Sequence, residues 1–195
     1  MAVSLVSTGV QFPDSTIQTT AAGGSGALIF LSSVTASNSA TVDLETTFNS
    51  TYDQYLITIS GMLPVQNNLE FGARFKQNGS YVTAGYRYHQ AQLRTNLATY
   101  SANQSTSYSY MLLGANVSNS FVSNLHLIIS TPTVADMPRI FGHGTIFSAS
   151  QGNMTQVIPV GYQADTSGAI QGVRFIMESG NITSGVFRLY GIKNS

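Results

Sequence analysis

The feature that most constrains the fold is a series of short runs in which apolar and polar residues alternate, each bounded by Gly, Asn, Ser or Pro. In one such run Leu69, Phe71, Ala73 and Phe75 would share one face of a strand, and the polar residues between them would share the other. Alternation with a period of two is typical of strands that bury one face only. The sequence therefore predicts a core enclosed by antiparallel strands.

Eight runs of this kind are evident after the first part of the chain. They occupy residues 55–60, 69–76, 108–113, 122–129, 139–147, 155–162, 173–177 and 186–192. Helical patterns are nearly absent, and the one candidate at residues 90–100 contains weak helix formers, so we expect a single turn there. About eight strands at this spacing predict an antiparallel β-sandwich, jelly-roll-like in arrangement.

Turn residues separate several of these runs. Asn78-Gly79 within residues 76–80 strongly predicts a tight turn that closes a hairpin, and residues 66–68 predict a turn of the same kind. The turn-rich segment 178–185 is expected to close an antiparallel hairpin. Strand ends, edges or bulges are the expected places of four prolines: Pro64, Pro132, Pro138 and Pro159.

The first 26 residues differ from the rest and predict an extended arm ahead of a domain at 27–195. Pro13 and Asp14 favour a turn, and the alternating stretches on either side of them are too short to bury a core of their own. Residues 21–26 form a Gly-rich linker that is flexible by composition. The arm is therefore interpreted as a segment that docks on a partner.

Composition excludes several classes of function. Charged residues are 8% of the 195 residues, against about 25% in ordinary soluble domains, and the net charge is zero. Without a cluster of Lys or Arg, nucleic acid is not expected as a partner. The chain has no cysteine, no apolar run of membrane-spanning length and no signal-peptide pattern at its start. We therefore expect synthesis in a cytoplasm and no membrane insertion.

No motif for catalysis is found. The G-x-S-x-G elbow, the P-loop and the H-E-x-x-H zinc helix are missing, and the carboxylates are scattered singly beside turn residues. His126 is interpreted as a solvent-facing or hydrogen-bonded strand residue, and His143 between two glycines as part of a bulge in preference to a ligand site. The sequence thus predicts a protein that is not an enzyme, with no catalytic residue, cofactor or metal.

Tyrosines give the clearest candidate surface. Because amphipathic rings suit either a subunit interface or a shallow sugar-binding surface, we expect one of these roles, with the interface favoured. The residues concerned are Tyr81, Tyr86, Tyr88, Tyr108 and Tyr110.

Residues 9–21, GVQFPDSTIQTTA, resemble a short motif of bacteriophage fibre and virion-surface proteins, loosely G-[IV]-x-F-P-D-G-T-x-Q-[ST]-T-A. Ser15 stands where glycine is usual. The segment GVFRLYGIK at residues 185–193 also resembles the last strand of small phage β-sandwich domains. The residues that the resemblance assigns to virion docking are Val10, Phe12, Pro13, Asp14, Ile17 and Gln18.

The resemblance implies a homotrimer on the exterior of a bacteriophage particle. Fully extended, the arm would span on the order of 90 Å, too little for a long shaft, which favours a capsid decoration or cement protein bound to the major capsid protein. Contact with host cell-surface polysaccharide is a possible second role. Alternatives are a short tail fibre or receptor-binding protein attached to a tail protein, a carbohydrate-binding module and, least favoured, a depolymerase.

Overall fold

The computed structural model describes residues 4–6, 9–11, 13, 17–18, 28–45, 48–49, 51–96, 100–130, 137–164 and 168–193. Within these ranges the chain forms sixteen strands and no helix, so none of the described residues belongs to a helix that could cross a membrane. The strands are β1 (Ser4–Val6), β2 (Gly9–Gln11), β3 (Ile17–Gln18), β4 (Leu28–Ser39), β5 (Thr41–Leu44), β6 (Tyr52–Pro64), β7 (Leu69–Gln77), β8 (Ser80–Tyr81), β9 (Tyr86–Arg94), β10 (Tyr100–Tyr108), β11 (Met111–Val117), β12 (Ser123–Ser130), β13 (Arg139–Ser148), β14 (Asn153–Gln163), β15 (Gly172–Met177) and β16 (Ile182–Lys193).

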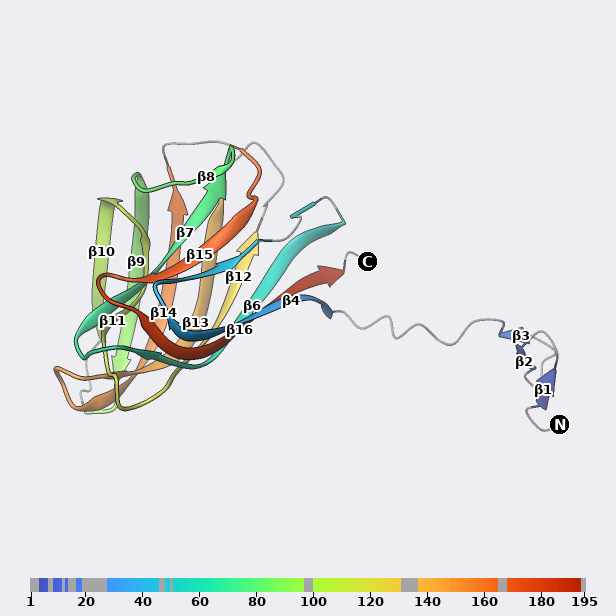
Figure 1. Ribbon diagram of the computed structural model, residues 1–195, viewed down its shortest axis with the longest axis horizontal. Helices are drawn as coiled ribbons and strands as arrows, with labels where there is room; N and C mark the ends of the chain where they lie inside the picture. The colour runs from blue at the N-terminus through green and yellow to red at the C-terminus, as the bar shows by residue number, and fades with distance from the viewer. Residues whose placement is uncertain are drawn as a thin grey trace.

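The strands make two separate sheets. The first three form a small antiparallel sheet in the order β1-β2-β3, and the other strands form one antiparallel sheet of thirteen. The small sheet shares no strand pairing with the large one, and Figure 1 draws the two apart. The prediction of an all-β, antiparallel, sandwich-like fold is confirmed.

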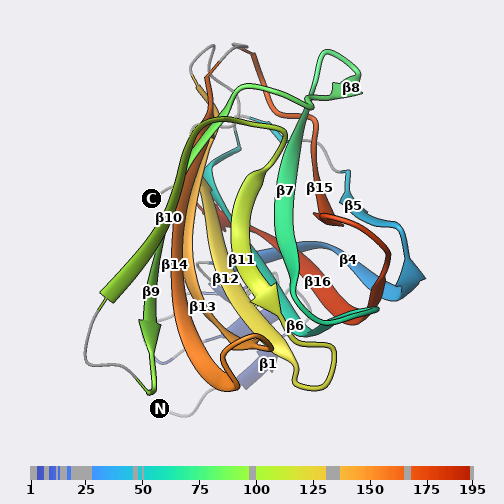
Figure 2. The same cartoon turned by 90° about the vertical axis from the view of Figure 1, so that its left-hand side faces the viewer.

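The large sheet folds over on itself to give two layers. The wider layer runs β4-β16-β6-β12-β13-β14-β9-β10, and the narrower layer runs β11-β7-β15-β5. The layers are joined where β11 pairs with β13 at a single position, Val117 opposite Ser148. Figure 2 shows β11, β7 and β15 as neighbours on one side of the domain.

Aromatic rings fill the space between the layers. Phe71 of β7 stacks on Phe175 of β15 with ring centroids 5.9 Å apart, and Phe175 meets Phe187 of β16 at 5.1 Å. All three side chains are fully buried, and burying one such ring stabilises a fold by about 1.5–3 kcal/mol. The predicted inward face of residues 69–76 is confirmed, since Leu69, Phe71, Ala73 and Phe75 are all buried.

The predicted tight turn is confirmed where the two strands that it joins lie in the same layer, and the predicted hairpin is wrong where the two strands lie in different layers. Asn78 and Gly79 adopt positive φ angles of 50° and 80° and connect β7 to β8, so the tight turn at 76–80 is confirmed. The hairpin expected at 178–185 is wrong, because β15 pairs with β5 and β7 whereas β16 pairs with β4 and β6. Residues 66–68 likewise lead from β6 in the wider layer to β7 in the narrower one.

Three local predictions also need correction. Residues 90–94 belong to β9 and a turn follows at 95–96, so the single helical turn is not found over 90–96, and residues 97–99 lie outside the described residues. The strand expected at 108–113 is divided by a bend at 109–110, with β10 before it and β11 after it. Pro159 lies inside β14, a strand paired on both sides, where the pairing with β13 is interrupted between Phe141 and Gly144.

The other prolines fit the prediction where they are described. Pro64 ends β6 and Pro138 directly precedes β13, whereas Pro132 lies outside the described residues.

Strands β12 and β13 approach each other unusually closely. A Cβ atom on Gly142 would lie 2.1 Å from the carbonyl oxygen of His126, and one on Gly144 would lie 2.4 Å from that of Asn124. No real Cβ atom tolerates these distances, so the two glycines are what allow this approach. The glycines that flank His143 therefore accommodate the backbone of the neighbouring strand.

We expect Gly144→Ala to lower the free energy of unfolding by about 1–3 kcal/mol, because the added methyl group forces the two backbones apart. Urea denaturation of the variant measures the loss. Thr145→Ala is the matched control, since Thr145 is the next residue and is exposed on the opposite face of β13. Equal stabilities of the two variants would contradict the close-approach explanation.

Candidate functional site

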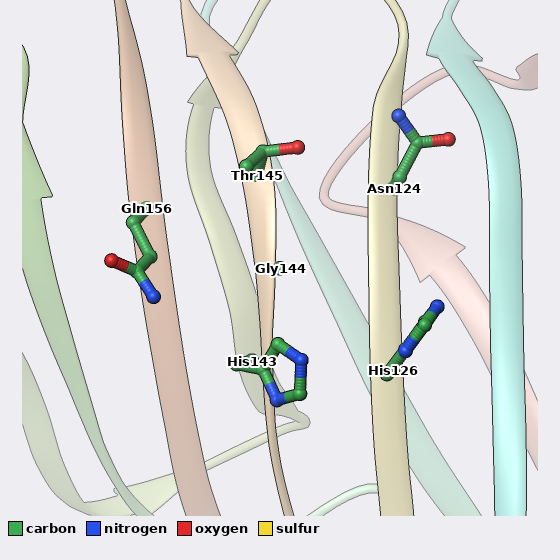
Figure 3. A pocket seen from close by; sticks show the side chains of 6 residues that line it. All are labelled: Asn124, His126, His143, Gly144, Thr145 and Gln156. Atoms are coloured by element: carbon green, nitrogen blue, oxygen red, sulfur yellow. The ribbon is translucent and has the colours of Figure 1, made fainter.

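The outer face of the wider layer carries an open cavity over β12, β13 and β14. Its volume is about 300 Å³. Alternation along the strands turns every second side chain of β12 and β13 away from the core, which is why polar residues collect on this face. The lining residues are Asn124, His126, His143, Gly144, Thr145 and Gln156 (Figure 3).

His126 and His143 lie side by side in this cavity. Antiparallel pairing of β12 with β13 sets them directly opposite each other, with ring centroids 5.6 Å apart and ring planes at 58°. Both side chains are exposed. The solvent-facing interpretation of His126 agrees with its exposure, but the sequence did not anticipate that the two imidazoles meet.

The polar side chains beside the histidines are arranged in a second row. Asn124 lies opposite Thr145 one step along the same two strands, and Gln156 continues the row on β14. The side-chain oxygen Oδ1 of Asn124 accepts a hydrogen bond from the backbone N–H of Gly61 at 2.9 Å, which fixes this amide. Among the described residues, those that line the cavity offer imidazole, amide and hydroxyl groups and no carboxylate.

An apolar stripe borders the cavity on the same face. We define it by five side chains of β9, β13 and β14 that are each 40–51% exposed: Leu93, Phe141, Met154, Ile158 and Val160. Strand register places Phe141 opposite Val160 on the neighbouring strand. Large exposed apolar residues gathered in one place indicate a surface that contacts another molecule.

Tyr81 lies away from this face, in a cluster of charges on the narrower layer. Its hydroxyl donates a hydrogen bond to Oε1 of Glu45 at 2.8 Å, and the guanidinium of Arg174 lies over its ring at 3.9 Å from the centroid. Burial, followed by the bond to Glu45, raises the pKa of Tyr81. The bonds from Lys76 and then Tyr81 lower the pKa of Glu45. The cluster holds β5, β7 and β15 together at the surface.

The other four tyrosines face inward to different extents. Tyr86 is fully buried, and its hydroxyl accepts a hydrogen bond from the N–H of Phe75 at 2.7 Å. Tyr110 is 5% exposed and donates to Oε2 of Glu70 at 2.6 Å, and Tyr108 donates to the same oxygen at 3.1 Å. Tyr88 packs edge-on against Tyr108.

Burial of Tyr86 and Tyr110 removes both from any surface of the described chain. Tyr81, Tyr88 and Tyr108 are half-buried and are the members of the set that can still reach a partner or a glycan. For these three the interface or sugar-contact role stays a prediction.

The predicted docking residues are described only in part. Val10 lies in β2, and Ile17 and Gln18 form β3, while Pro13 occupies an exposed turn between these strands. Register pairs Val10 with Gln18. Two further predicted docking residues, Phe12 and Asp14, lie outside the described residues.

Comparison with known proteins gives little. No family model and no curated protein matches the chain. A solved structure with weak similarity is described as the CBM2 module of Lactobacillus casei BL23 phage J-1 evolved Dit. The comparison covers 99% of this chain and 92% of that chain, with 9% sequence identity. Its TM-score of 0.26 is too low to establish a shared fold.

Tyrosine burial predicts a loss of stability at alkaline pH. Burial raises the pKa of Tyr86. Burial also raises the pKa of Tyr110, and the hydrogen bond from Tyr110 to Glu70 raises it further. Burial, followed by the charge of Glu70, raises the pKa of Tyr88 to about 12. Above pH 10 the unfolded chain loses phenolic protons that the folded chain keeps. The free energy of unfolding should be unaffected by these groups below about pH 10 and should fall above it, by about 1.4 kcal/mol per pH unit for each fully protected tyrosine.

Urea denaturation at pH 8, 9.5 and 11 tests this expectation. Tyr110→Phe should show a smaller fall between pH 9.5 and 11 than the wild type. Tyr100→Phe is the matched control, because Tyr100 is 56% exposed, and it should retain the full fall. If Tyr110→Phe keeps the wild-type pH profile, Tyr110 does not contribute to it.

Proposed function

We propose that the protein is a structural protein of a bacteriophage virion, displayed on the particle exterior as a homotrimer. Residues 1–26 attach it to the particle and the β-sandwich domain projects outward. The observation that carries the proposal is the separation of the arm: β1, β2 and β3 pair only with one another, and β2 and β3 contain all the described residues of the phage-like motif except Pro13.

The arm suits attachment for a physical reason. Strands of two or three residues bury too little surface to be stable alone, so a small sheet of this kind needs a partner surface. The major capsid protein is the partner that we favour for the arm. A tail protein is the alternative partner, and the domain would then be a short tail fibre.

Self-association is supported by the outer face of the wider layer. The large side chains of the apolar stripe are exposed to water. Contact with a second copy of the chain would remove them from water and stabilise the assembly by about 25 cal/mol per Å² of apolar surface buried. Charge does not oppose such a contact, since the chain has eight basic and eight acidic residues. We therefore assign the stripe to the contact between copies in the trimer.

Deleting residues 1–26 should leave a folded domain that no longer joins the particle, because the deletion removes the attachment segment and none of the thirteen-stranded sheet. Circular dichroism checks the fold, and an immunoblot of purified particles measures incorporation. At single-residue level Phe12→Ala should reduce incorporation, whereas Ser15→Gly, which restores the usual residue of the motif, should not. Full incorporation of the deleted chain would defeat the proposal.

Imaging of labelled particles separates the two locations. Many copies spread over the shell would support decoration of the capsid, and a few copies at one vertex would support a tail fibre.

Val160→Glu should convert the trimer to monomer, because the contact would then bury an unpaired carboxylate in each copy at a cost of several kcal/mol. Sedimentation equilibrium measures the assembly state. Val65→Glu is the matched control, since Val65 and Val160 are both 47% exposed and Val65 lies outside the stripe. A trimer that persists with Val160→Glu, or a wild type that is monomeric, would exclude the stripe as the contact.

A further inference from the structure

His126 and His143 form the one pair of imidazoles among the described residues for which a ring contact is found. The sequence favoured a structural role for each histidine separately. The structure brings them together across β12 and β13, 17 positions apart in the chain, and leaves both exposed in the same cavity. Neither histidine is needed by the proposed function.

The separation of the two rings is close to the one that shared coordination of a metal ion requires. Zn²⁺ holds imidazole nitrogens at about 2.0–2.1 Å, so two imidazoles on one ion have ring centroids roughly 4.5–5.5 Å apart, depending on the angle at the metal. The observed 5.6 Å is just beyond this range. Because both side chains are exposed, a small rotation of either ring would bring two nitrogens onto one ion without moving the backbone.

We propose that His126 and His143 bind a single divalent ion of a late transition metal, Zn²⁺ or Cu²⁺. Neutral imidazole suits these ions, whereas Ca²⁺ and Mg²⁺ require oxygen ligands and usually carboxylates. The part of the chain that the structure describes places no carboxylate in the lining of the cavity, so these ligands favour Zn²⁺ or Cu²⁺ over Ca²⁺ or Mg²⁺. Water completes the coordination sphere.

The backbone around the pair is held in place before a metal binds. The glycines on either side of His143 let β13 approach the backbone of β12 closely, and Asn124 is fixed to Gly61 on β6 through its side chain. The antiparallel pairing of β12 with β13, continuous from Asn124 to Ser130, fixes the two ligand-bearing backbones relative to each other. Metal binding needs only side-chain rotation, which keeps its entropic cost low.

The number of protein ligands sets the expected preference. Within the described ranges no group of three or more His, Cys, Asp or Glu side chains is placed to hold a metal, so the site has two protein ligands. A site of this kind binds Cu²⁺ more tightly than Zn²⁺. Removal of one of two imidazoles should weaken binding by at least about tenfold, since even changes outside the ligand set commonly cost that much.

Isothermal titration of the full chain with ZnCl₂ and CuCl₂ tests the proposal, using protein purified without a polyhistidine tag. We expect one ion per chain for the wild type, and affinities at least about tenfold lower for His126→Ala and His143→Ala. His89→Ala is the matched control and should bind as the wild type does, because His89 lies on β9, beyond β14, and does not line this cavity. The Cu²⁺ electron paramagnetic resonance spectrum should show coupling to two nitrogens.

Two results would overturn the proposal. One is equal metal affinity of the wild type and of both His126→Ala and His143→Ala, and the other is a Cu²⁺ spectrum with a single coupled imidazole nitrogen. Melting curves without metal check that the variants are folded, and His126→Gln and His143→Gln replace the alanine variants if they are not. Virion incorporation is not a readout of this experiment, so its outcome is independent of the proposed function.

Discussion

Contact between the two layers of the large sheet is the interaction on which the rest of the structure depends. A chain with 8% charged residues and no cysteine has few other means of stabilisation. The ion pair Lys76–Glu45 lies at the surface, where a pair is typically worth about 0–1 kcal/mol, and Arg174–Asp43 is a single bidentate pair that is also partly exposed. The rings of Phe71, Phe175 and Phe187 are fully buried between the layers and contribute more than both pairs together. Strand register, and with it every surface feature, follows from keeping these rings inside.

Local pattern was enough to find most strands but not to pair them. Alternation at residues 69–76 identified the buried face because the period of a strand is a property of neighbouring residues. The segment 178–185 looks like a hairpin loop by the same local criteria, yet it joins strands of different layers. Which strand lies beside which is decided by burial of residues far apart in the chain, and one sequence contains no direct record of that choice. The same limit applies to Tyr86 and Tyr110, for which the sequence predicts a surface position. A tyrosine whose hydroxyl bonds to a group inside the protein gives the same sequence pattern as a tyrosine whose hydroxyl bonds to water.

The histidine pair shows how a signal can be present and still be missed. Both histidines were placed on strands, and consecutive strands usually pair, so their juxtaposition was within reach of sequence reasoning. What could not be derived is the register, because a shift by one residue would have turned one ring into the core. Gly142 and Gly144 indicate that register only when the backbone of β12 is seen against them. In β13 the alternating glycines Gly142 and Gly144 therefore mark close strand approach and not a bulge.

Two parts of the chain, the arm and the outer face of the wider layer, each need a partner surface. The arm consists of strands of two or three residues, which are too short to be stable alone, and the wider layer exposes Phe141, Ile158 and Val160 on the face opposite the core. The narrower layer cannot cover that face because it packs on the other side. The arm does not pair with it either, since the small sheet and the large sheet share no strand pairing. Apolar surface that a chain cannot cover by itself is stabilised when other chains cover it. The proposed function uses the two surfaces separately, the apolar stripe for contact between copies and the arm for attachment to a particle.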